Sequence, residues 1–218
     1  MIYTNKINQD NSDVIFSEYE KILRKRAISI YNYDLSNLLI ENKCLNKISF
    51  VNCNLSGSKF INCSFKNGNF CNCNLSNVNL ETSNIKKCNF HKNILDNIIM
   101  PNYPMACPEY GSFVGYKKVV DFNDFTKHYI LKLRIPADAK RSSATDKLCR
   151  CNKAEVLNIQ NLDGSSVDNI LTARNICNYK FIYKIGEIVE EPNFNECRWE
   201  EYTSGIHFFI NREDAVNY

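Results

Sequence analysis

Large apolar residues recur at every fifth position over a long stretch of the chain. The fifteen positions are Ile30, Leu35, Ile40, Leu45, Phe50, Leu55, Phe60, Phe65, Phe70, Leu75, Leu80, Ile85, Phe90, Leu95 and Met100. An α-helix repeats about every 3.6 residues and a strand about every 2, so a strict period of five fits neither element. The pattern predicts a coil with flat sides, in which each side points one large residue inward and stacked coils share one core.

The other positions of the five-residue unit are also regular. The residue two before each large one is often small, and the residue just before it is often Asn or Ser, as in Cys53–Gly57, Cys63–Asn67 and Cys73–Asn77. Over residues 28–102 this pattern resembles the pentapeptide-repeat family. The resemblance implies a right-handed quadrilateral β-helix with four units to a coil. Fifteen units then make about four coils, which at roughly 4.8 Å a coil stand under about 20 Å tall.

A capping helix is predicted just before the repeats, over Asp13–Ala27, with Ser12 or Asp13 as its N-cap. One face, suited to covering the open end of the coil, carries Ile15, Tyr19, Ile22 and Leu23. The last turns, where the helix dipole favours cations, carry Lys21, Arg24, Lys25 and Arg26. This basic run is consistent with nucleic-acid binding or with a solvated helix end, and we expect the second.

The period of five ends at Pro101. Pro104, Pro108 and Gly111 follow closely, and no later segment restores the repeat. We therefore expect three parts: an N-terminal segment with the capping helix (1–27), a pentapeptide-repeat β-helix (28–102) and a C-terminal domain (103–218). The whole chain is predicted to be mainly β.

The C-terminal domain is predicted to be a small α+β domain. Strands are expected where β-branched and aromatic residues lie between turn residues, at 113–120, 129–135, 151–159, 180–189 and 205–210. Positions 129, 131, 133 and 135 form an apolar face, whereas Lys132 and Arg134 point the other way. Asn211 is the expected N-cap of a short C-terminal helix.

Composition is that of a folded protein, with 44% hydrophobic and 23% charged residues. The N-terminal Met1–Lys6 segment is polar, and no run of about eighteen apolar residues occurs. We therefore expect a cytoplasmic protein that does not associate with membranes.

The eleven cysteines admit disulfide, metal and packing interpretations. In a reducing cytoplasm Cys53, Cys63, Cys73 and Cys88 are expected to fill the coil as small apolar residues. The pairs Cys71/Cys73 and Cys149/Cys151 could each offer two metal ligands on one strand face. Neither pair is followed by a second pair of ligands at the spacing typical of zinc fingers, and His91, His128 and His207 are scattered along the chain. We therefore expect no metal and no cofactor.

Several phrases of the C-terminal domain resemble an uncharacterised domain family found behind pentapeptide repeats in bacterial and phage proteins. They are Val114–Lys118, Ile135–Ser143, Cys149–Ala154, Tyr183–Glu187 and Gly205–Ile210. The resemblance spans nearly all of residues 111–218 and implies no established activity. It makes a bacterial or phage origin, and a role in phage–host conflict, reasonable expectations.

Basic and hydroxyl side chains in these phrases suggest an anion site, since cations supply charge while hydroxyls and amides supply directed hydrogen bonds. The candidate ligand-binding residues are Lys117, Lys118, Arg141, Ser142, Ser143, Arg150 and His207. The alternative is a solvated loop in which Arg141 pairs with an acidic neighbour and His207 is packed or hydrogen-bonded. No catalytic residues are assigned, because phosphate-loop, zinc-protease and nucleophile-elbow motifs are absent from the sequence.

Two other functions deserve comparison. Residues 205–218 resemble a strand and short helix of ADP-ribosyltransferases, but those enzymes usually place a glutamate on a later strand, and the chain ends eight residues after Ile210.

Some pentapeptide-repeat proteins mimic DNA against type II topoisomerases, which requires an acidic rod. Residues 28–100 hold seven Lys or Arg against four Asp or Glu, the opposite sign.

We therefore expect a binding protein rather than an enzyme. The β-helix would serve as a scaffold or dimerisation surface, and the C-terminal domain would bind a protein or an anionic, nucleotide-like molecule. Nucleic acid is not the expected partner, because residues 103–218 carry fifteen basic and sixteen acidic residues and the whole chain has a net charge of only +3.

Overall fold

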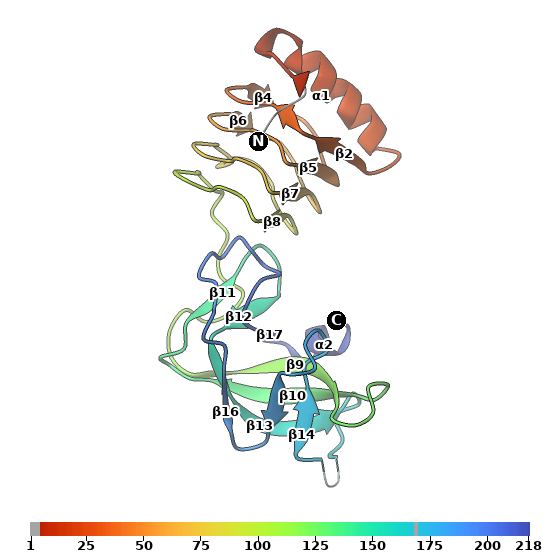
Figure 1. The fold of residues 1–218 in the computed structure, drawn as a ribbon, viewed down its shortest axis with the longest axis vertical. Coiled ribbons are helices and arrows are strands. Elements are labelled where there is room, and N and C mark those ends of the chain that lie inside the picture. The colour runs from red at the N-terminus through yellow and green to blue at the C-terminus, as the bar shows by residue number, and fades with distance from the viewer. Residues whose placement is uncertain (1–4, 168–169) are drawn as a thin grey trace. The chain divides into compact units, whose positions relative to one another are not determined.

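The computed structural model describes residues 5–167 and 170–218, and the chain divides between Pro104 and Met105 into two compact units (Figure 1). Residues 1–4 of the polar N-terminal segment lie outside the described residues. Strands outnumber helices in both units, with one helix described in each, and the fold as a whole is mainly β, as predicted. No helix within the described ranges is long and apolar enough to cross a membrane.

The first unit is a β-solenoid of parallel strands. The order β2-β5-β7-β8 stacks four strands on one side, and β4 pairs with β6 on another (Figure 1). The bounds are β2 Ile28–Tyr31, β4 Leu39–Glu41, β5 Ile48–Val51, β6 Lys59–Ile61, β7 Asn69–Cys71 and β8 Asn89–His91. Ile30 lies beside Phe50, Phe50 beside Phe70 and Phe70 beside Phe90. The predicted coil of twenty residues is confirmed, and it makes about three full turns from β2 to β8.

The repeated large residues fill the interior of the solenoid. Every fifth residue from Ile30 to Phe90 is at most 5% exposed. The rings of Phe50 and Phe70 stack with centroids 5.3 Å apart, and those of Phe70 and Phe90 with centroids 4.9 Å apart. Cysteines pack among them as small residues, and Cys88 donates its thiol hydrogen to the Phe65 carbonyl.

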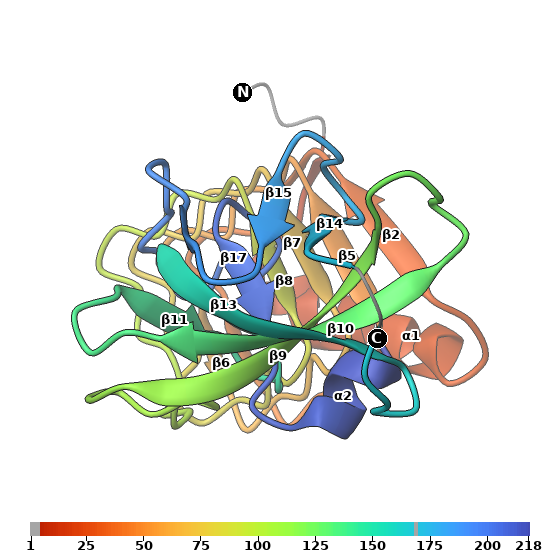
Figure 2. The same ribbon diagram turned by 90° about the horizontal axis from the view of Figure 1, so that it is seen from below.

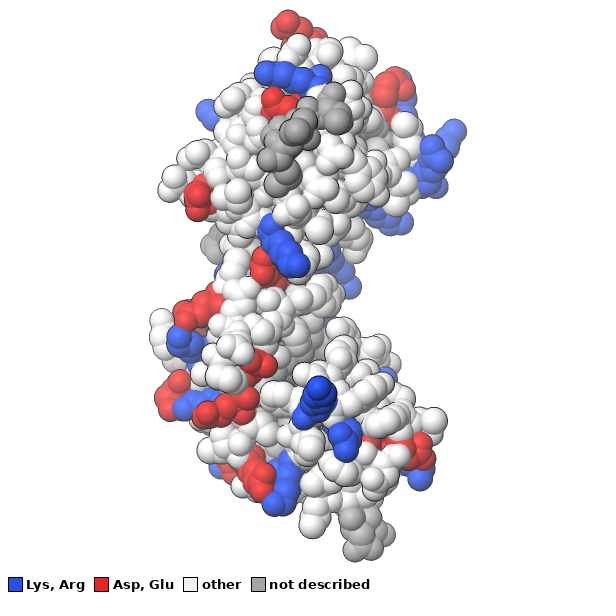
Figure 3. Space-filling model, in the orientation of Figure 1, with Lys and Arg blue, Asp and Glu red and all other residues white. Residues whose placement is uncertain are grey.

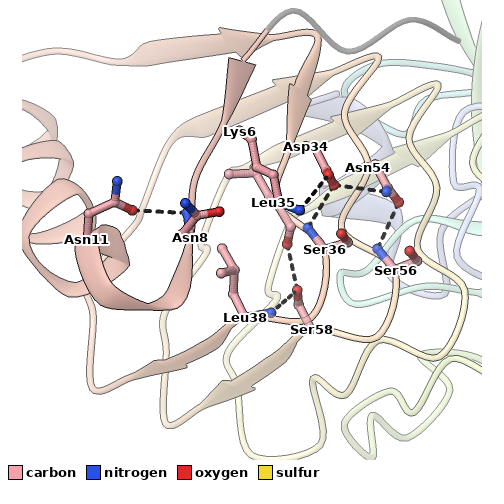
Figure 4. Close-up of polar contacts among 10 residues, drawn as sticks. All are labelled: Lys6, Asn8, Asn11, Asp34, Leu35, Ser36, Leu38, Asn54, Ser56 and Ser58. Atoms are coloured by element: carbon pink, nitrogen blue, oxygen red, sulfur yellow. Dashed lines mark hydrogen bonds and ion pairs between the residues drawn. The ribbon is translucent and has the colours of Figure 1, made fainter.

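The corners of the coil need left-handed backbone conformations. All twelve non-glycine residues with positive φ in the described ranges lie in the solenoid, and nine of them are Asn while three are Lys. Asn tolerates this conformation better than other non-glycine residues. Short polar side chains also bind the turns: the Asn54 side chain accepts a hydrogen bond from Ser56 N, and Ser58 Oγ bridges Leu35 O and Leu38 N (Figure 4).

Helix α1 (Gln9–Leu23) and the short pairing of β1 (Asn5–Lys6) with β3 (Tyr33–Asp34) cap the first coil. The predicted N-cap is wrong: Asn8 is the cap, and its N–H donates to the Asn11 side chain (Figure 4). The Ser12 hydroxyl instead donates within the helix to Gln9 O. The helix begins earlier than predicted because the Gln9 side chain forms two hydrogen bonds with the main chain of Leu39.

The C-terminal unit is built around a six-stranded antiparallel sheet with the order β15-β14-β9-β10-β13-β16 (Figures 1 and 2). The bounds are β9 Phe113–Asp121, β10 His128–Ile135, β13 Lys153–Asn161, β14 Thr172–Arg174, β15 Ile182–Lys184 and β16 Ile188–Glu190. The edge strands β15 and β16 are joined by only Ile185–Glu187, which spans about 11 Å at most. The sheet must therefore curl until its edges approach, and it encloses the core of this unit.

A second sheet has the order β11-β12-β17, with β11 at Arg141–Ser143, β12 at Cys149–Cys151 and β17 at Ile206–Phe208. Helix α2 (Arg212–Val216) follows, and Asn211 caps it as predicted, because its side chain accepts from Glu213 N.

The predicted bounds of two strands are wrong. Residues 180–189 form two strands, because Gly186 has a φ of 81° and turns the chain. Residues 151–159 belong to two sheets, because Asn152 leaves the strand direction and binds the main chain of Lys140. The predicted loop at 139–144 contains the strand β11.

Candidate functional site

The C-terminal unit contains a pocket of about 390 Å³. Three of the predicted ligand-binding residues line it: Lys117, Lys118 and His207. Residues from several other parts of the chain also line it, including Cys177, Tyr202 and Ser204. The volume lies within the range typical of small-molecule sites.

Lys117 is the central cation of this pocket. It lies on β9 opposite Leu131 of β10, and only 7% of the residue is exposed. Its Nζ donates to His207 O at 3.1 Å and lies 6.0 Å from the centroid of the Tyr183 ring. Burial lowers the pKa of Lys117 from 10.5 to about 8, because the charged form has lost most of its water. Within the described chain Lys117 forms no ion pair.

His207 lies on β17 and is neutral. Its Nε2 is 3.1 Å from Glu201 O, and since a carbonyl can only accept, Nε2 must carry the hydrogen. Burial, aided by the positive charge of Lys117, lowers the pKa of His207 to about 4. At neutral pH this side chain therefore offers hydrogen bonding without charge.

Lys118 approaches the pocket from the other side of β9. Its Nζ donates to Val216 O, in the last turn of α2, at 2.9 Å. A cation there interacts favourably with the end of the helix. Lys118 thus fixes α2 and adds positive charge to the lining.

Arg150 does not line the pocket but supports its wall. The residue is 1% exposed, and its guanidinium donates to the carbonyls of Asn195, Ser204 and Cys197, each at 2.9 Å. It also lies over the Phe194 ring. These bonds hold the loop between residues 194 and 204, whose last part faces the pocket.

The predicted cluster at 141–143 lies outside the pocket lining. Arg141 donates to main-chain carbonyls, including Pro136 O at 2.6 Å and Gly111 O at 2.7 Å, rather than to the acidic neighbour considered from sequence. Ser143 Oγ accepts from Ala106 N. Ser142 is buried, and its hydroxyl has no hydrogen-bond partner among the described residues. The structure therefore gives Arg141 and Ser143 local structural contacts.

Several lining residues carry no signal in the sequence. Tyr202 and Tyr218 belong to irregular or terminal segments, and partial burial raises the pKa of both phenols, which keeps them protonated. Cys177 lies in a loop far from β9 in sequence. Within the described ranges, no cluster of three or more His, Cys, Asp or Glu residues could hold a metal ion.

The solenoid and the curled antiparallel sheet define a pentapeptide-repeat protein with an added C-terminal domain. Residues 48–91 match the pentapeptide repeats, and residues 103–215, more than half of the chain, match a family of unknown function (DUF5758). The chain belongs to this family.

Comparison with solved structures gives a pentapeptide repeat protein (Rfr23) from the cyanobacterium Cyanothece 51142. It is 21% identical, the match covers 34% of this chain and 57% of that one, and the TM-score is 0.29. No curated protein matches the chain.

Proposed function

We propose that this is a binding protein whose C-terminal unit holds a small anionic ligand beside Lys117, with the solenoid as a scaffold. One observation carries the proposal: a buried lysine lines a pocket of about 390 Å³ and has no ion-pair partner among the described residues. An unpaired buried charge is costly. A carboxylate or phosphate would provide the counter-charge.

The rest of the lining indicates the body of such a ligand. Leu148, Ile176 and Phe209 supply apolar surface, and Thr203 and Ser204 supply polar groups. The lining has two lysines and one acid, Glu191, so the formal charge of its side chains is +1. These features favour an organic anion with an aromatic or aliphatic body, such as an aryl carboxylate or a nucleoside monophosphate.

The hydrogen bonds at the pocket support binding rather than catalysis. Lys117 Nζ donates to the His207 carbonyl, and His207 Nε2 donates to the Glu201 carbonyl. Among the described residues, neither side chain forms a hydrogen bond with a nucleophilic hydroxyl or thiol, as a general base would. Both residues line the pocket, which supports the proposed contact with a ligand.

Calorimetric titration with benzoate and AMP, and with their neutral counterparts benzamide and adenosine, tests this proposal. We expect only the anions to bind. Their affinity should fall as pH rises through about 8, because an anion prefers the ammonium form of Lys117.

Lys117→Met should abolish binding, whereas Lys127→Met, which removes a lysine paired with Asp124 outside the pocket lining, should leave it unchanged. Failure of both anions to bind the unmodified protein, or equal binding of the neutral compounds, would contradict the proposal.

A further inference from the structure

One edge of the solenoid carries a column of exposed cations. Arg24, Lys25 and Arg26 follow α1, and Lys47, Lys66 and Lys86 lie at corners of later coils; all six are exposed. We name these six residues the basic edge. In Figure 3, blue side chains descend along one side of this unit below the loop that follows α1.

Backbone hydrogen bonds place the corners of the basic edge one above another. The N–H of Lys47 donates to Lys66 O at 2.9 Å, and the N–H of Asn67 donates to Lys86 O at 3.0 Å. Ile28, just after the arginine-rich turn, pairs with Ile48, just after Lys47. Neighbouring coils are about 4.8 Å apart, so the three steps from one coil to the next extend the column over about 14 Å.

These cations lack the carboxylate partners that other lysines of the unit have. Lys6, Lys21 and Lys43 form ion pairs with Asp34, Glu18 and Asp13. Among the described residues, none of the six basic-edge side chains forms an ion pair. The nearest acids in sequence on the later coils, Glu41 and Glu81, precede the corners by at least five residues.

We propose that the basic edge binds the phosphate backbone of a nucleic-acid duplex without reading its sequence. A duplex carries about one charge per 1.7 Å, so about 14 Å of duplex presents roughly eight phosphate charges. The six corner positions, 46, 47, 66, 67, 86 and 87, are all Asn or Lys, and all but Asn46 are exposed. They offer no apolar or aromatic anchor of the kind found at the centre of a protein interface.

The small net charge of the chain does not oppose this proposal, because it averages over surfaces of opposite sign. The acidic residues of the first unit lie mainly on α1 and on other sides of the coil. Phosphate contacts depend on the local density of cations, and the solenoid repeat concentrates six of them on one edge.

Fluorescence anisotropy with a labelled, mixed-sequence DNA duplex of about 20 base pairs tests the proposal. We expect binding at about 50 mM salt that weakens steeply towards about 200 mM. The variant Lys47→Asn/Lys66→Ser/Lys86→Ser uses residues that this chain itself has at equivalent repeat positions, such as Asn77, Ser56 and Ser76. It should bind at least about tenfold more weakly, with a salt slope reduced by about 0.9 for each phosphate that the variant no longer neutralises.

The matched control is Lys59→Asn/Lys92→Asn/Lys127→Gln, which removes three charges that do not belong to the basic edge and should bind as the unmodified protein does. Three outcomes would overturn the proposal: no binding by the unmodified protein, equal weakening in the control, or unchanged binding in the basic-edge variant. Poly-glutamate that binds more tightly than the duplex would also overturn it and assign the edge to an acidic protein partner. Circular dichroism establishes that both triple variants are folded.

Discussion

Lys117 of β9 donates its Nζ hydrogen bond to the main-chain carbonyl of His207 on β17, 3.1 Å away. One carbonyl replaces only part of the water that an ammonium group loses on burial, and the pKa of Lys117 is correspondingly lowered to about 8. The same ammonium helps to keep His207 neutral. In the proposed function, this ammonium is the group whose charge a bound anion would balance.

Replacing Lys117 should stabilise the ligand-free protein. A fall in pKa from 10.5 to about 8 corresponds to about 3 kcal/mol of unfavourable burial near neutral pH. Lys117→Met removes the charge and keeps a long apolar side chain, so the free energy of unfolding by urea at pH 7 should rise by about 1–3 kcal/mol.

The pH dependence gives this prediction a sharper test. Because the folded pKa of Lys117 is lowered, the unfolded protein binds more protons between about 8 and 10.5, and stability should increase with pH over that range. Lys117→Met should lose the increase, while the exposed control Lys180→Met should retain it. A less stable Lys117→Met protein at pH 7 would show that the hydrogen bond outweighs the cost of burial.

His207 should make the protein sensitive to mild acid. Its pKa is about 4 in the fold and 6.5 when unperturbed, so the unfolded state takes up the proton first as pH falls. We expect a loss of up to about 3 kcal/mol between pH 6.5 and 4 from this residue. His207→Gln, which can still donate to Glu201 O, should flatten the dependence in urea titrations. An equally steep dependence in that variant would assign the acid sensitivity to other groups.

Arg150 should be needed for the order of the pocket wall. Its three carbonyl partners come from one loop, and Arg150→Met would remove the guanidinium donor from all three. The carbonyls of Ser204 and Cys197 would keep only longer bonds from main-chain N–H groups, of 3.4 and 3.3 Å. We expect a loss of about 2–4 kcal/mol in unfolding free energy and faster amide exchange at residues 195–204. Arg134→Met removes a 52% exposed guanidinium paired with Glu155 and should cost less than about 1 kcal/mol. Equal effects of the two substitutions would contradict this role.

The solenoid was predictable because its rule is local. Each five-residue unit repeats the same inward position, and stacking turns a period in sequence into a column in space, as from Phe50 to Phe90. The same stacking brings Lys66 and Lys86 into the basic edge, although in the sequence they counted only toward the total charge of residues 28–100. The N-cap was missed because the start of α1 depends on contacts between Gln9 and Leu39, thirty residues apart.

The pocket was only partly predictable, because its residues come from distant segments. Lys117, Lys118 and His207 were identified by residue type, and the structure brings them together. Arg141 and Arg150 are of the same type, but main-chain carbonyls occupy their guanidinium groups. The sequence does not reveal which main-chain carbonyls will need a side-chain donor in the fold. Arginines that bind carbonyls therefore could not be distinguished from arginines that bind a ligand.

Ser58 should contribute to stability through two buried hydrogen bonds in the solenoid. Its Oγ donates to Leu35 O at 2.7 Å and accepts from Leu38 N at 2.9 Å, which ties one coil to the previous one (Figure 4). Ser58→Ala leaves both main-chain groups buried without that partner and should cost about 1–3 kcal/mol.

The equivalent inward positions 53, 63, 73 and 88 hold cysteines. Ser58→Cys should therefore cost less than Ser58→Ala, because its thiol fits and can still donate to Leu35 O, as the Cys88 thiol does to Phe65 O. Ser56→Ala, at the partly exposed turn beside it, should change the unfolding free energy by less than about 0.5 kcal/mol. Thermal unfolding of the three variants tests this order, and a Ser58→Ala protein as stable as Ser56→Ala would show that the coils do not depend on this bridge.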